Sequence, residues 1–480
     1  MSNSKKPNIL YVVIDGFRTD KFYGPNKTSI TPFLDSLIKK GIFFDQCVSS
    51  APCTIPSIAS TITSLYPFEC IIQDENIFTL NPQSKTYISN LKKFGYTTYA
   101  TYQDIIYFLG LDKIYDFSET YSVHSKLWNG LGKQIIEKLD NKMKEPWFYY
   151  LHLYDLHLLS FSKDHLLKNG PKEIHDKKFG VNPYERIITA IDPWLKKIIE
   201  SVDLKNTIIV ITSDHGSYTA SYTKELEEFN YKNIESRTYN PSNLFKIAQN
   251  ISKFIPPAIF IGKKKLAKIY ISRTDSKIKK NVLPNLAKIN QNVSTYTKRL
   301  MHASVTGESS VYDDLFRIPL LILGYNVPSN EIIHKQVRSV DIFPTLFDIA
   351  KLDEKPLGHG MNVMPLIHDL LFEELPAFLE AAYNSPRFGT TKIIGIRTSK
   401  FKYFREKYDE KSQVHLYDLE NDPLEEKNIA KNNLKIIKKM EEILLQLQND
   451  NGFDYKKSHQ ILNIDEEKKI EQELRKMGYM

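Results

Sequence analysis

The chain has 480 residues and a formal net charge of +8, with 41% hydrophobic and 25% charged residues. These values are typical of a folded globular protein and exclude a wholly disordered, collagen-like or multi-span membrane chain. The length suits one large domain with an appendage, or two to three average domains.

Apolar strands and amphipathic helices alternate through the first 350 residues. Strands are expected where β-branched and aromatic residues run together, at Asn8–Ile14, Thr97–Thr101, Trp147–Leu153, Thr207–Thr212 and Arg317–Leu323. Helices are expected at Thr31–Lys40, Ser57–Ser64, Tyr87–Phe94, Pro183–Val202 and Val340–Ala350. Strands that are apolar throughout are buried on both faces, so this alternation predicts an α/β fold with a mostly parallel central sheet and helices on both sides.

The pattern changes after about residue 370. Short strands are expected at Ala377–Ala382, Lys392–Arg397, Lys402–Arg405 and Val414–Asp418, followed by helices at Asn433–Asn449 and Glu466–Met477. We therefore expect an α/β domain over residues 1–370 and a small C-terminal α+β subdomain with an antiparallel sheet over residues 371–480.

Positive charge gathers in residues 217–301, which we interpret as a basic insertion. The segment has 16 Lys and Arg against five acidic residues, a net charge of +11, and this leaves −3 for the rest of the chain. A local basic excess favours an anionic partner, and a solvated insertion with no role is the alternative. The apolar run at 254–261 beside Lys263–Lys265 suits an anionic membrane surface, and no nucleic-acid-binding module is recognisable.

The cysteine content bears on the compartment. Cys47, Cys53 and Cys70 are too few, and odd in number, for a disulfide framework, which favours a reducing compartment. The first residues do not resemble a signal peptide, and no stretch approaches the length of a membrane span. We expect a cytoplasmic protein, with peripheral membrane contact through 217–301 as an open alternative.

Three predicted strands each end in polar residues that can bind metals. Asp15 follows the first strand, Asp155 and His157 follow the strand that ends at residue 153, and Asp214 and His215 follow the strand that ends at residue 212. Ligands of open α/β sheets bind beyond the carboxyl ends of the strands, so these side chains are expected to meet. One such residue alone would be explained as a loop residue or a helix cap. Because several occur at strand ends, we predict a metal-binding or catalytic site. Carboxylates with an imidazole suit Ca²⁺, Mg²⁺, Mn²⁺ or Zn²⁺.

A fourth element is the segment Ala51–Ser60. Pro56 suits the first turn of a helix, which places Thr54 at or just before a helix N-terminus. The free N–H groups and the positive end of the dipole favour a bound oxyanion there. A threonine hydroxyl is a weak nucleophile unless a metal stabilises its alkoxide, and a plain N-cap is the alternative role.

Several motifs in one order along most of the chain resemble the alkaline phosphatase superfamily, on its sulfatase and phosphodiesterase branch. The motifs are Asp15–Asp20, Thr31–Asp35, Thr54–Ser57, Gly95–Thr98, Leu151–His157, Thr212–Gly216, Arg317–Leu320, Asp341–Thr345 and Leu416–Asn428. The resemblance implies the sulfatase-like α/β fold and an enzyme that acts on anionic esters. It therefore assigns residues 1–370 as the catalytic domain.

The resemblance also implies roles for individual residues. Asp15, Asp214 and His215 match metal-ligand positions, and Thr54 matches the nucleophile, which also coordinates the metal. His157 matches a histidine that contacts the ester's non-bridging or leaving oxygen. The implied cofactor is at least one divalent ion, and the ion is Ca, Mn, Zn or Mg.

The chain departs from the pattern of the formylglycine sulfatases, which carry Cys-x-Pro-Ser-Arg. Thr54 stands at the cysteine position, Cys53 is one residue out of register, and Ile58 replaces the arginine. Formylglycine is therefore not expected. Gly16 follows Asp15 where many relatives have a second aspartate, so one possible ligand is missing.

Three further residues have candidate roles in or near the site. In the family, a Lys or His that contacts the anionic substrate usually follows the position of Gly216 after a short distance. Here the basic insertion intervenes, and His302 is the nearest candidate for that contact. Asp155 is a second candidate for substrate binding or for a second metal site. His152 also matches a family position, and we expect it to be mainly structural.

The expected function is a metal-dependent sulfatase-like hydrolase that cleaves phosphate mono- or diesters, or related sulfate and phosphonate esters, through a covalent Thr54 intermediate. Alternatives are a transferase that moves a phospho-substituent to a glycan or lipid, a sulfuric ester hydrolase without formylglycine, and a non-enzymatic binding protein. The expected partners are an anionic ester substrate and, through 217–301, an anionic membrane surface or a charged glycan. No specific nucleic acid is expected.

Overall fold

The computed structural model describes residues 5–74, 77–122, 124–140, 143–157, 170–218, 293–306, 310–367, 374–381, 384–385, 389–390 and 392–449. The chain divides into two compact units, the larger from 1–220, 310–382 and 392–480 and the smaller from 221–309 and 383–391. The described elements of the smaller unit are helix α12 (Thr295–Thr306) and the antiparallel pair β13 (Asn384–Ser385) and β14 (Gly389–Thr390).

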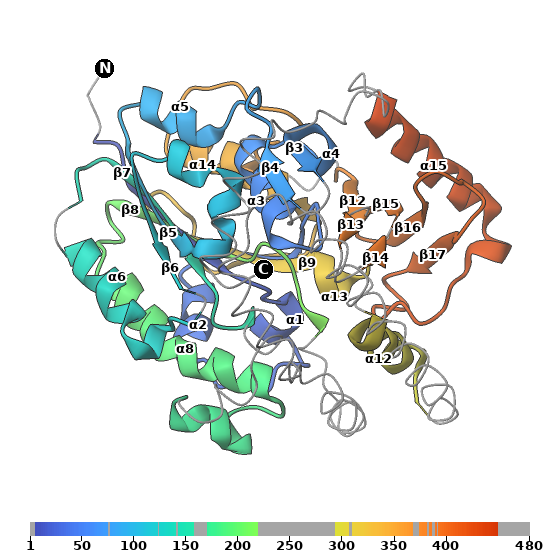
Figure 1. Cartoon of the computed structure of the whole chain (residues 1–480), viewed down its shortest axis with the longest axis horizontal. Coiled ribbons are helices and arrows are strands. Elements are labelled where there is room, and N and C mark those ends of the chain that lie inside the picture. Colours follow the sequence, from blue (N-terminus) through green and yellow to red (C-terminus); the bar gives the residue numbers. More distant parts are fainter. Residues whose placement is uncertain are drawn as a thin grey trace, which may run out of the picture. The chain divides into compact units, whose positions relative to one another are not determined.

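A mostly parallel sheet lies at the centre of the larger unit (Figure 1). Its described strands are β1 (Asn8–Ile14), β2 (Gly41–Val48), β5 (Thr97–Gln103), β6 (Phe117–Tyr121), β7 (Trp147–Leu153), β8 (Thr207–Thr212), β9 (Arg317–Gly324), β10 (Glu331–Ile333) and β11 (Val337–Arg338). The strand order is β10-β2-β9-β8-β1-β7-β5-β6, with β11 also beside β2. Within this part of the chain only β9 is antiparallel to its neighbours, which are β2 and β8. The predicted α/β fold is confirmed.

Helices cover both faces of the sheet, which explains why β1 is apolar and buried along its whole length. Ile9, Tyr11 and Val13 face the cluster that contains residues of α3 (Thr54–Thr63), α5 (Tyr87–Lys93) and α14 (Ile342–Ile349). The alternate residues of β1 face the cluster that contains residues of α2 (Pro32–Ile38), α6 (Leu131–Asp140) and α8 (Pro183–Glu200). The two groups of helices lie on opposite sides of the sheet in Figure 1.

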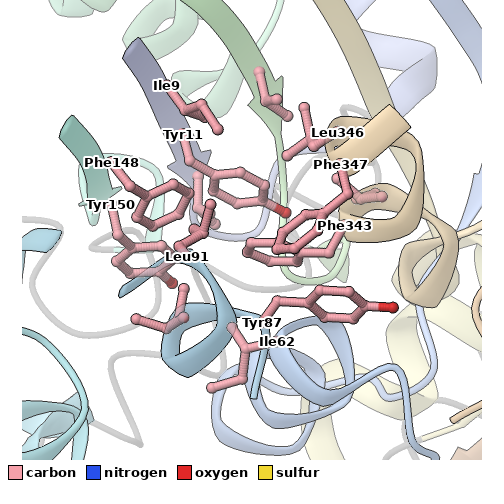
Figure 2. Close-up of a cluster of buried hydrophobic side chains, with 14 of the residues drawn as sticks. Ile9, Tyr11, Ile62, Tyr87, Leu91, Phe148, Tyr150, Phe343, Leu346 and Phe347 are labelled. Carbon is pink, nitrogen blue, oxygen red and sulfur yellow. The ribbon is translucent and has the colours of Figure 1, made fainter. Parts of the chain in front are cut away.

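Stacked aromatic rings pack α5 and α14 against the face of the sheet on which Tyr11 lies (Figure 2). The Phe343 ring of α14 lies between Tyr11 of β1 and Tyr87 of α5, with centroid distances of 5.4 and 5.3 Å. The ring planes are within 13° and 12° of parallel. Such pairs contribute about 0.5–1.5 kcal/mol each beyond the burial of their area. They also fix the distance between the helices and the strand.

Short elements connect the layers. They are α1 (Thr19–Phe22), α4 (Pro67–Cys70), α13 (Asp313–Phe316) and the hairpin of β3 (Ile71–Asp74) and β4 (Ile77–Leu80). No helix among the described residues combines the length and the apolar character needed to cross a membrane.

The C-terminal region forms a second sheet, as expected. Four antiparallel strands lie in the order β12 (Ala377–Ala381), β15 (Ile393–Arg397), β16 (Phe401–Glu406) and β17 (His415–Asp418). Helix α15 (Leu434–Asn449) packs Met440 and Leu444 against Ile394 and Ile396 of the sheet. The alternating apolar residues of β15 therefore supply one face of this small core.

The structure differs from the sequence predictions at several elements. Helix α3 begins at Thr54 rather than Ser57, and β6, α6 and the β3–β4 hairpin were not expected. The sequence of β6 is polar because this strand lies at the end of the sheet, so it carries no apolar run. The predicted helix at 466–477, the proposed boundary at 370/371 and residues 219–292 of the insertion lie outside the described residues, and these expectations stay predictions.

A buried ion network joins the C-terminal sheet to α13. Arg397 of β15 donates two hydrogen bonds to the carboxylate of Asp313, at 2.9 and 2.8 Å. Lys402 of β16 also binds Asp313 and lies 2.8 Å from Glu425. Burial alone would raise the pKa of Asp313, but Arg397 and Lys402 outweigh it and hold that pKa well below its usual range. Asp313 is therefore ionised in the folded protein at neutral pH.

Replacing Arg397 with Met should lower the free energy of unfolding by about 3–5 kcal/mol, because a buried carboxylate loses its bidentate partner. Asp313 has a depressed pKa in the folded state, so its pairing stabilises the protein above about pH 4 and is lost as the pH falls below that value. The difference between wild type and variant should therefore be largest near neutral pH and smaller near pH ~3 in urea unfolding. Lys400→Met is the matched control: its pair with Glu420 is exposed, and its loss should cost less than about 1 kcal/mol. Equal effects of the two variants would contradict a larger stabilising role for the buried pair of Arg397 and Asp313 than for the exposed pair.

Candidate active site

Three adjacent strands bring most of the predicted site residues to one edge of the sheet. Strands β8, β1 and β7 are parallel neighbours, so their carboxyl ends lie together. Asp15 directly follows β1, and Asp214 and His215 come just after β8. His152 lies near the end of β7, and His157 follows that strand.

Helix α3 carries Thr54 to the same edge. The helix begins at this residue, with Cys53 as an extended N-cap, and Pro56 fits the first turn because no N–H partner is needed there. Thr54 Oγ1 lies 3.3 Å from Asp15 Oδ2 and 3.2 Å from His215 Nε2. The hydroxyl expected from the sequence to be the nucleophile thus lies against two of the expected metal ligands.

The two oxygens of Asp15 face different partners. Oδ1 is 2.7 Å from His157 Nδ1, whereas Oδ2 is 3.3 Å from both Thr54 Oγ1 and His152 Nε2. Gln103 Nε2 also donates to Oδ2 at 3.4 Å. Burial would raise the pKa of Asp15, but the surrounding histidines outweigh burial and hold the pKa well below its usual value. This carboxylate is therefore an anionic centre that several groups share.

The tautomer of His215 follows from one hydrogen bond. Its Nδ1 lies 2.7 Å from the carbonyl oxygen of Gly216, and because a carbonyl only accepts, Nδ1 carries a hydrogen. Nε2 is left facing Thr54 Oγ1 and, at 3.4 Å, Asp214 Oδ2. Burial lowers the pKa of His215, but Asp214 and Asp15 outweigh it, so the pKa is raised. Nε2 therefore attracts a cation, either a proton or a metal ion.

Asp214 has one satisfied and one unsatisfied oxygen. Oδ1 accepts hydrogen bonds from the backbone N–H groups of Gly16 and His215, at 3.1 and 2.9 Å. Oδ2 is buried and has no hydrogen-bond partner within the described ranges. A buried carboxylate oxygen without a donor is costly unless a cation binds it, so the donor set fits a divalent ion. Two groups of converging donors are present: Asp15, His157 and His215, and Asp15, His152 and Asp214.

Asp155 and His302, the two further residues expected to contact substrate, belong to neither of the two groups of converging donors among the described residues. Asp155 is fully buried and accepts a hydrogen bond from the backbone N–H of Leu127 at 3.1 Å. Burial raises the pKa of Asp155, while the nearby Lys126 opposes this change. His302 is an exposed residue of α12 in the smaller unit. Substrate contacts by Asp155 and His302 remain predictions.

Three residues near the site have no site role predicted from the sequence. The sequence favours a structural role for His152, yet its Nε2 lies 3.3 Å from Asp15 Oδ2. Gln103 is the last residue of β5, two residues beyond the predicted end of that strand, and the strand-end pattern used elsewhere could have found it. Lys126 is almost fully buried, which lowers its pKa to about 8, and nothing in its sequence context signals burial.

Known protein families match most of the chain. Residues 7–352 match the family model described as Sulfatase, and residues 306–450 match the model of the C-terminal part of N-sulphoglucosamine sulphohydrolase. A curated relative is arylsulfatase K of Gallus gallus, 21% identical, with 93% of this chain and 83% of the relative covered.

Solved structures share the fold. A 2-O GAG sulfatase matches with a TM-score of 0.63 and 16% identity, covering 94% of each chain. A second protein, solved in complex with its substrate D-glucosamine-2-N,6-O-disulfate, matches with a TM-score of 0.60 and 16% identity over 92% of this chain and 98% of its own. Because the sulfatase model spans well over half of its length, the chain belongs to the sulfatase family, within the alkaline phosphatase superfamily.

Proposed function

We propose that this protein is a metal-dependent hydrolase that cleaves a sulfate ester with Thr54 as its nucleophile. The main support is the position of Thr54 Oγ1, within 3.3 Å of Asp15 and His215 in the first turn of a helix. Ester hydrolysis of the sulfatase type follows from the family. Three parts of the proposal go beyond the family: the role of Thr54 as nucleophile, the bound metal ion and the preference for a sulfate ester.

Asp15, Asp214 and His215 would hold the metal, with Thr54 beside it. His215 Nε2 lies 3.4 Å from Asp214 Oδ2 and 4.0 Å from Asp15 Oδ1, and the buried Oδ2 of Asp214 has no hydrogen-bond partner among the described residues. A divalent ion bound there (Ca, Mn, Zn or Mg) would polarise an oxygen of the ester and stabilise the alkoxide form of Thr54. The residues present therefore fit the kind of ion that the family generally uses.

The chain offers Thr54 two proton acceptors, Asp15 Oδ2 and His215 Nε2. Once its proton has left, Oγ1 attacks the sulfur atom; an O–S bond forms while the bond to the ester oxygen breaks, and the alcohol departs with a proton. Water then attacks the sulfur of the sulfothreonine, which releases sulfate and returns a proton to Oγ1. The sum of the two steps is hydrolysis of one ester bond by one water molecule.

Charge that develops on the transferred group needs donors on the protein. The first turn of α3 directs backbone N–H groups and the positive end of its dipole towards the region of Thr54 Oγ1. His157 has a side chain that is 25% exposed, so a substrate oxygen can reach it. We assign His157 to binding of the anion or of the leaving oxygen.

A phosphate diester is the second candidate substrate, because residue 54 is threonine. The neighbouring Cys53 is displaced by one position from the place of the cysteine in the formylglycine motif, and Thr54 stands at that place. A formylglycine route is therefore not part of the proposal. The same residues would serve phosphoryl transfer to water or, in a transferase, to an acceptor hydroxyl on a glycan or lipid.

The substrate class that we propose is an anionic sulfated sugar or a similar ester. One structural neighbour was solved with a glucosamine disulfate, and this supports the class without naming the compound. We also propose a cytoplasmic location, and contact of 217–301 with an anionic membrane or a charged glycan. Liposome pelleting of the full chain and of a chain that lacks 217–301 tests the membrane contact.

Assays with p-nitrophenyl esters should rank the substrates. We expect the highest kcat/KM for the sulfate ester, compared with the phosphate monoester, the phosphate diester and a phosphonate, each measured with Ca²⁺, Mn²⁺, Zn²⁺ and Mg²⁺. Preference for the diester would replace the first candidate by the second. Absence of turnover on all four esters would favour the non-enzymatic binding protein.

Replacing Thr54 with Ala should reduce kcat by about 10⁴-fold or more, because the covalent step loses its attacking oxygen. The serine variant at the same position should keep measurable activity, since it keeps the hydroxyl. Thr61→Ala is the control: that hydroxyl lies in the same helix but donates to the backbone carbonyl of Ser57. Mass spectrometry of the quenched wild type should find the transferred group on the peptide that contains Thr54. Near-normal turnover by Thr54→Ala would refute the mechanism.

Metal binding should be visible as a gain in thermal stability. A divalent ion at 100 times its Kd should stabilise the chelator-treated protein by about 2.7 kcal/mol, measured by differential scanning fluorimetry. Asp15→Asn should abolish the gain, because it removes the carboxylate that both donor groups share. Asp192→Asn should keep it: that buried carboxylate accepts backbone N–H groups of α2 instead. A gain that survives Asp15→Asn would place the ion elsewhere.

A further inference from the structure

His152 holds a position that packing alone does not explain. It lies inside β7, opposite Val13 of β1, and its side chain is fully buried. Its Nε2 is 3.3 Å from Asp15 Oδ2 and 3.9 Å from Asp214 Oδ2. The ring therefore directs one nitrogen between two carboxyl groups that come from the ends of two other strands.

The opposite ring nitrogen has a partner that orients it. Tyr150, two residues earlier on the same face of β7, places its hydroxyl 2.8 Å from His152 Nδ1. A tyrosine hydroxyl can accept a hydrogen bond from an imidazole N–H. With Nδ1 protonated and donating to that oxygen, Nε2 presents its lone pair to the carboxyl groups. Histidines that bind metals are usually oriented in this way.

Two of the donor-to-donor distances have the size that a single small ion requires. Tetrahedral donors at about 2.0–2.1 Å from an ion are roughly 3.3–3.4 Å apart. His152 Nε2 lies 3.3 Å from Asp15 Oδ2, and His215 Nε2 lies 3.4 Å from Asp214 Oδ2. Two further distances are longer: His152 Nε2 is 3.9 Å from Asp214 Oδ2, and His215 Nε2 is 4.0 Å from Asp15 Oδ1. His152, Asp15 and Asp214 offer donors that converge on one place.

The unsatisfied oxygen of Asp214 helps to distinguish two roles of His152, a purely structural one and that of a metal ligand. If His152 only donated a hydrogen bond to Asp15, Asp214 Oδ2 would stay buried without a partner, as it is within the described chain. His215 cannot serve it in the neutral form, because the hydrogen of that ring is on Nδ1, which faces Gly216. A cation between these groups satisfies both lone pairs and both carboxyl oxygens.

We propose that His152 is a direct metal ligand, which with Asp15, Asp214 and His215 completes a set of two carboxylates and two imidazoles. The inference deepens the proposed function, since it concerns the same metal site. Imidazole nitrogens suit Zn²⁺ and similar first-row ions, whereas Ca²⁺ and Mg²⁺ are bound mainly by oxygen. Two imidazoles beside two carboxylates therefore favour Zn²⁺ over Ca²⁺.

Metal affinity measured without substrate tests the inference. The full-length chain is stripped with a chelator and titrated with Zn²⁺, Mn²⁺ and Ca²⁺ separately, in competition with a chromophoric chelator. Wild type should bind Zn²⁺ at least about 100-fold more tightly than Ca²⁺. His152→Ala and His152→Gln should each bind Zn²⁺ at least about 100-fold more weakly than wild type, since a direct ligand matters more than the outer groups, whose loss costs 10–100-fold.

Two further variants define the specificity of the effect. Tyr150→Phe should weaken Zn²⁺ binding by about 10-fold or more, because it removes the group that orients His152. His415→Ala is the matched control: this partly buried histidine also contacts a tyrosine hydroxyl, that of Tyr417 at 3.0 Å, but in the C-terminal sheet. It should leave Zn²⁺ affinity unchanged.

Substitution with Co²⁺ adds a readout that does not depend on affinity. Loss of an imidazole nitrogen should change the visible absorption of the Co²⁺ protein in His152→Gln and leave it unchanged in His415→Ala. Circular dichroism of the metal-free variants checks folding, and the glutamine variant replaces the alanine variant if the latter unfolds.

Unchanged Zn²⁺ affinity together with an unchanged Co²⁺ spectrum in a folded His152 variant would overturn the inference. Equal affinity of wild type for Ca²⁺ and Zn²⁺ would overturn the selectivity. Because Thr54→Ala should still bind Zn²⁺, failure of the proposed ester hydrolysis would leave these measurements intact, and the two failures can be told apart.

Discussion

Two buried carboxyl groups, Asp15 and Asp214, lie at the ends of adjacent parallel strands and share the same small space. Burying such groups is costly unless opposite charge or donors surround them, and three imidazoles and a threonine hydroxyl are gathered there. The parallel order of β8, β1 and β7 is what makes this gathering possible. The chemistry of the site thus follows from where the strands end.

Helix α3 contributes residues both to the hydrophobic core and to the candidate site. The first turn of this helix carries Thr54, while Ile58 and Ile62 belong to the cluster that covers β1. The same cluster holds Tyr150, which touches His152. A change in core packing on this face would therefore move Thr54 and His152 together.

Much of the α/β fold could be predicted because strands such as Asn8–Ile14 are apolar throughout, a pattern that only burial on both faces explains. The strand-end rule then grouped Asp15 and Asp214, and a proline in the first turn placed Thr54 near a helix N-terminus. The position of His152 could not be foreseen, because a histidine inside an apolar strand gives no sign of which groups its face will meet. The reversed direction of β9 also has no local signal, since alternation and burial are the same in either direction.

That reversed strand also sets when one sheet contact can form. Strand β2, whose end leads into α3, is joined to β8 through β9, which lies between them. More than one hundred residues separate β8 from β9 along the chain. On a ribosome, β2 can therefore pair with β9 only after residue 324 has left the exit tunnel, long after Asp15 and Thr54 have been synthesised.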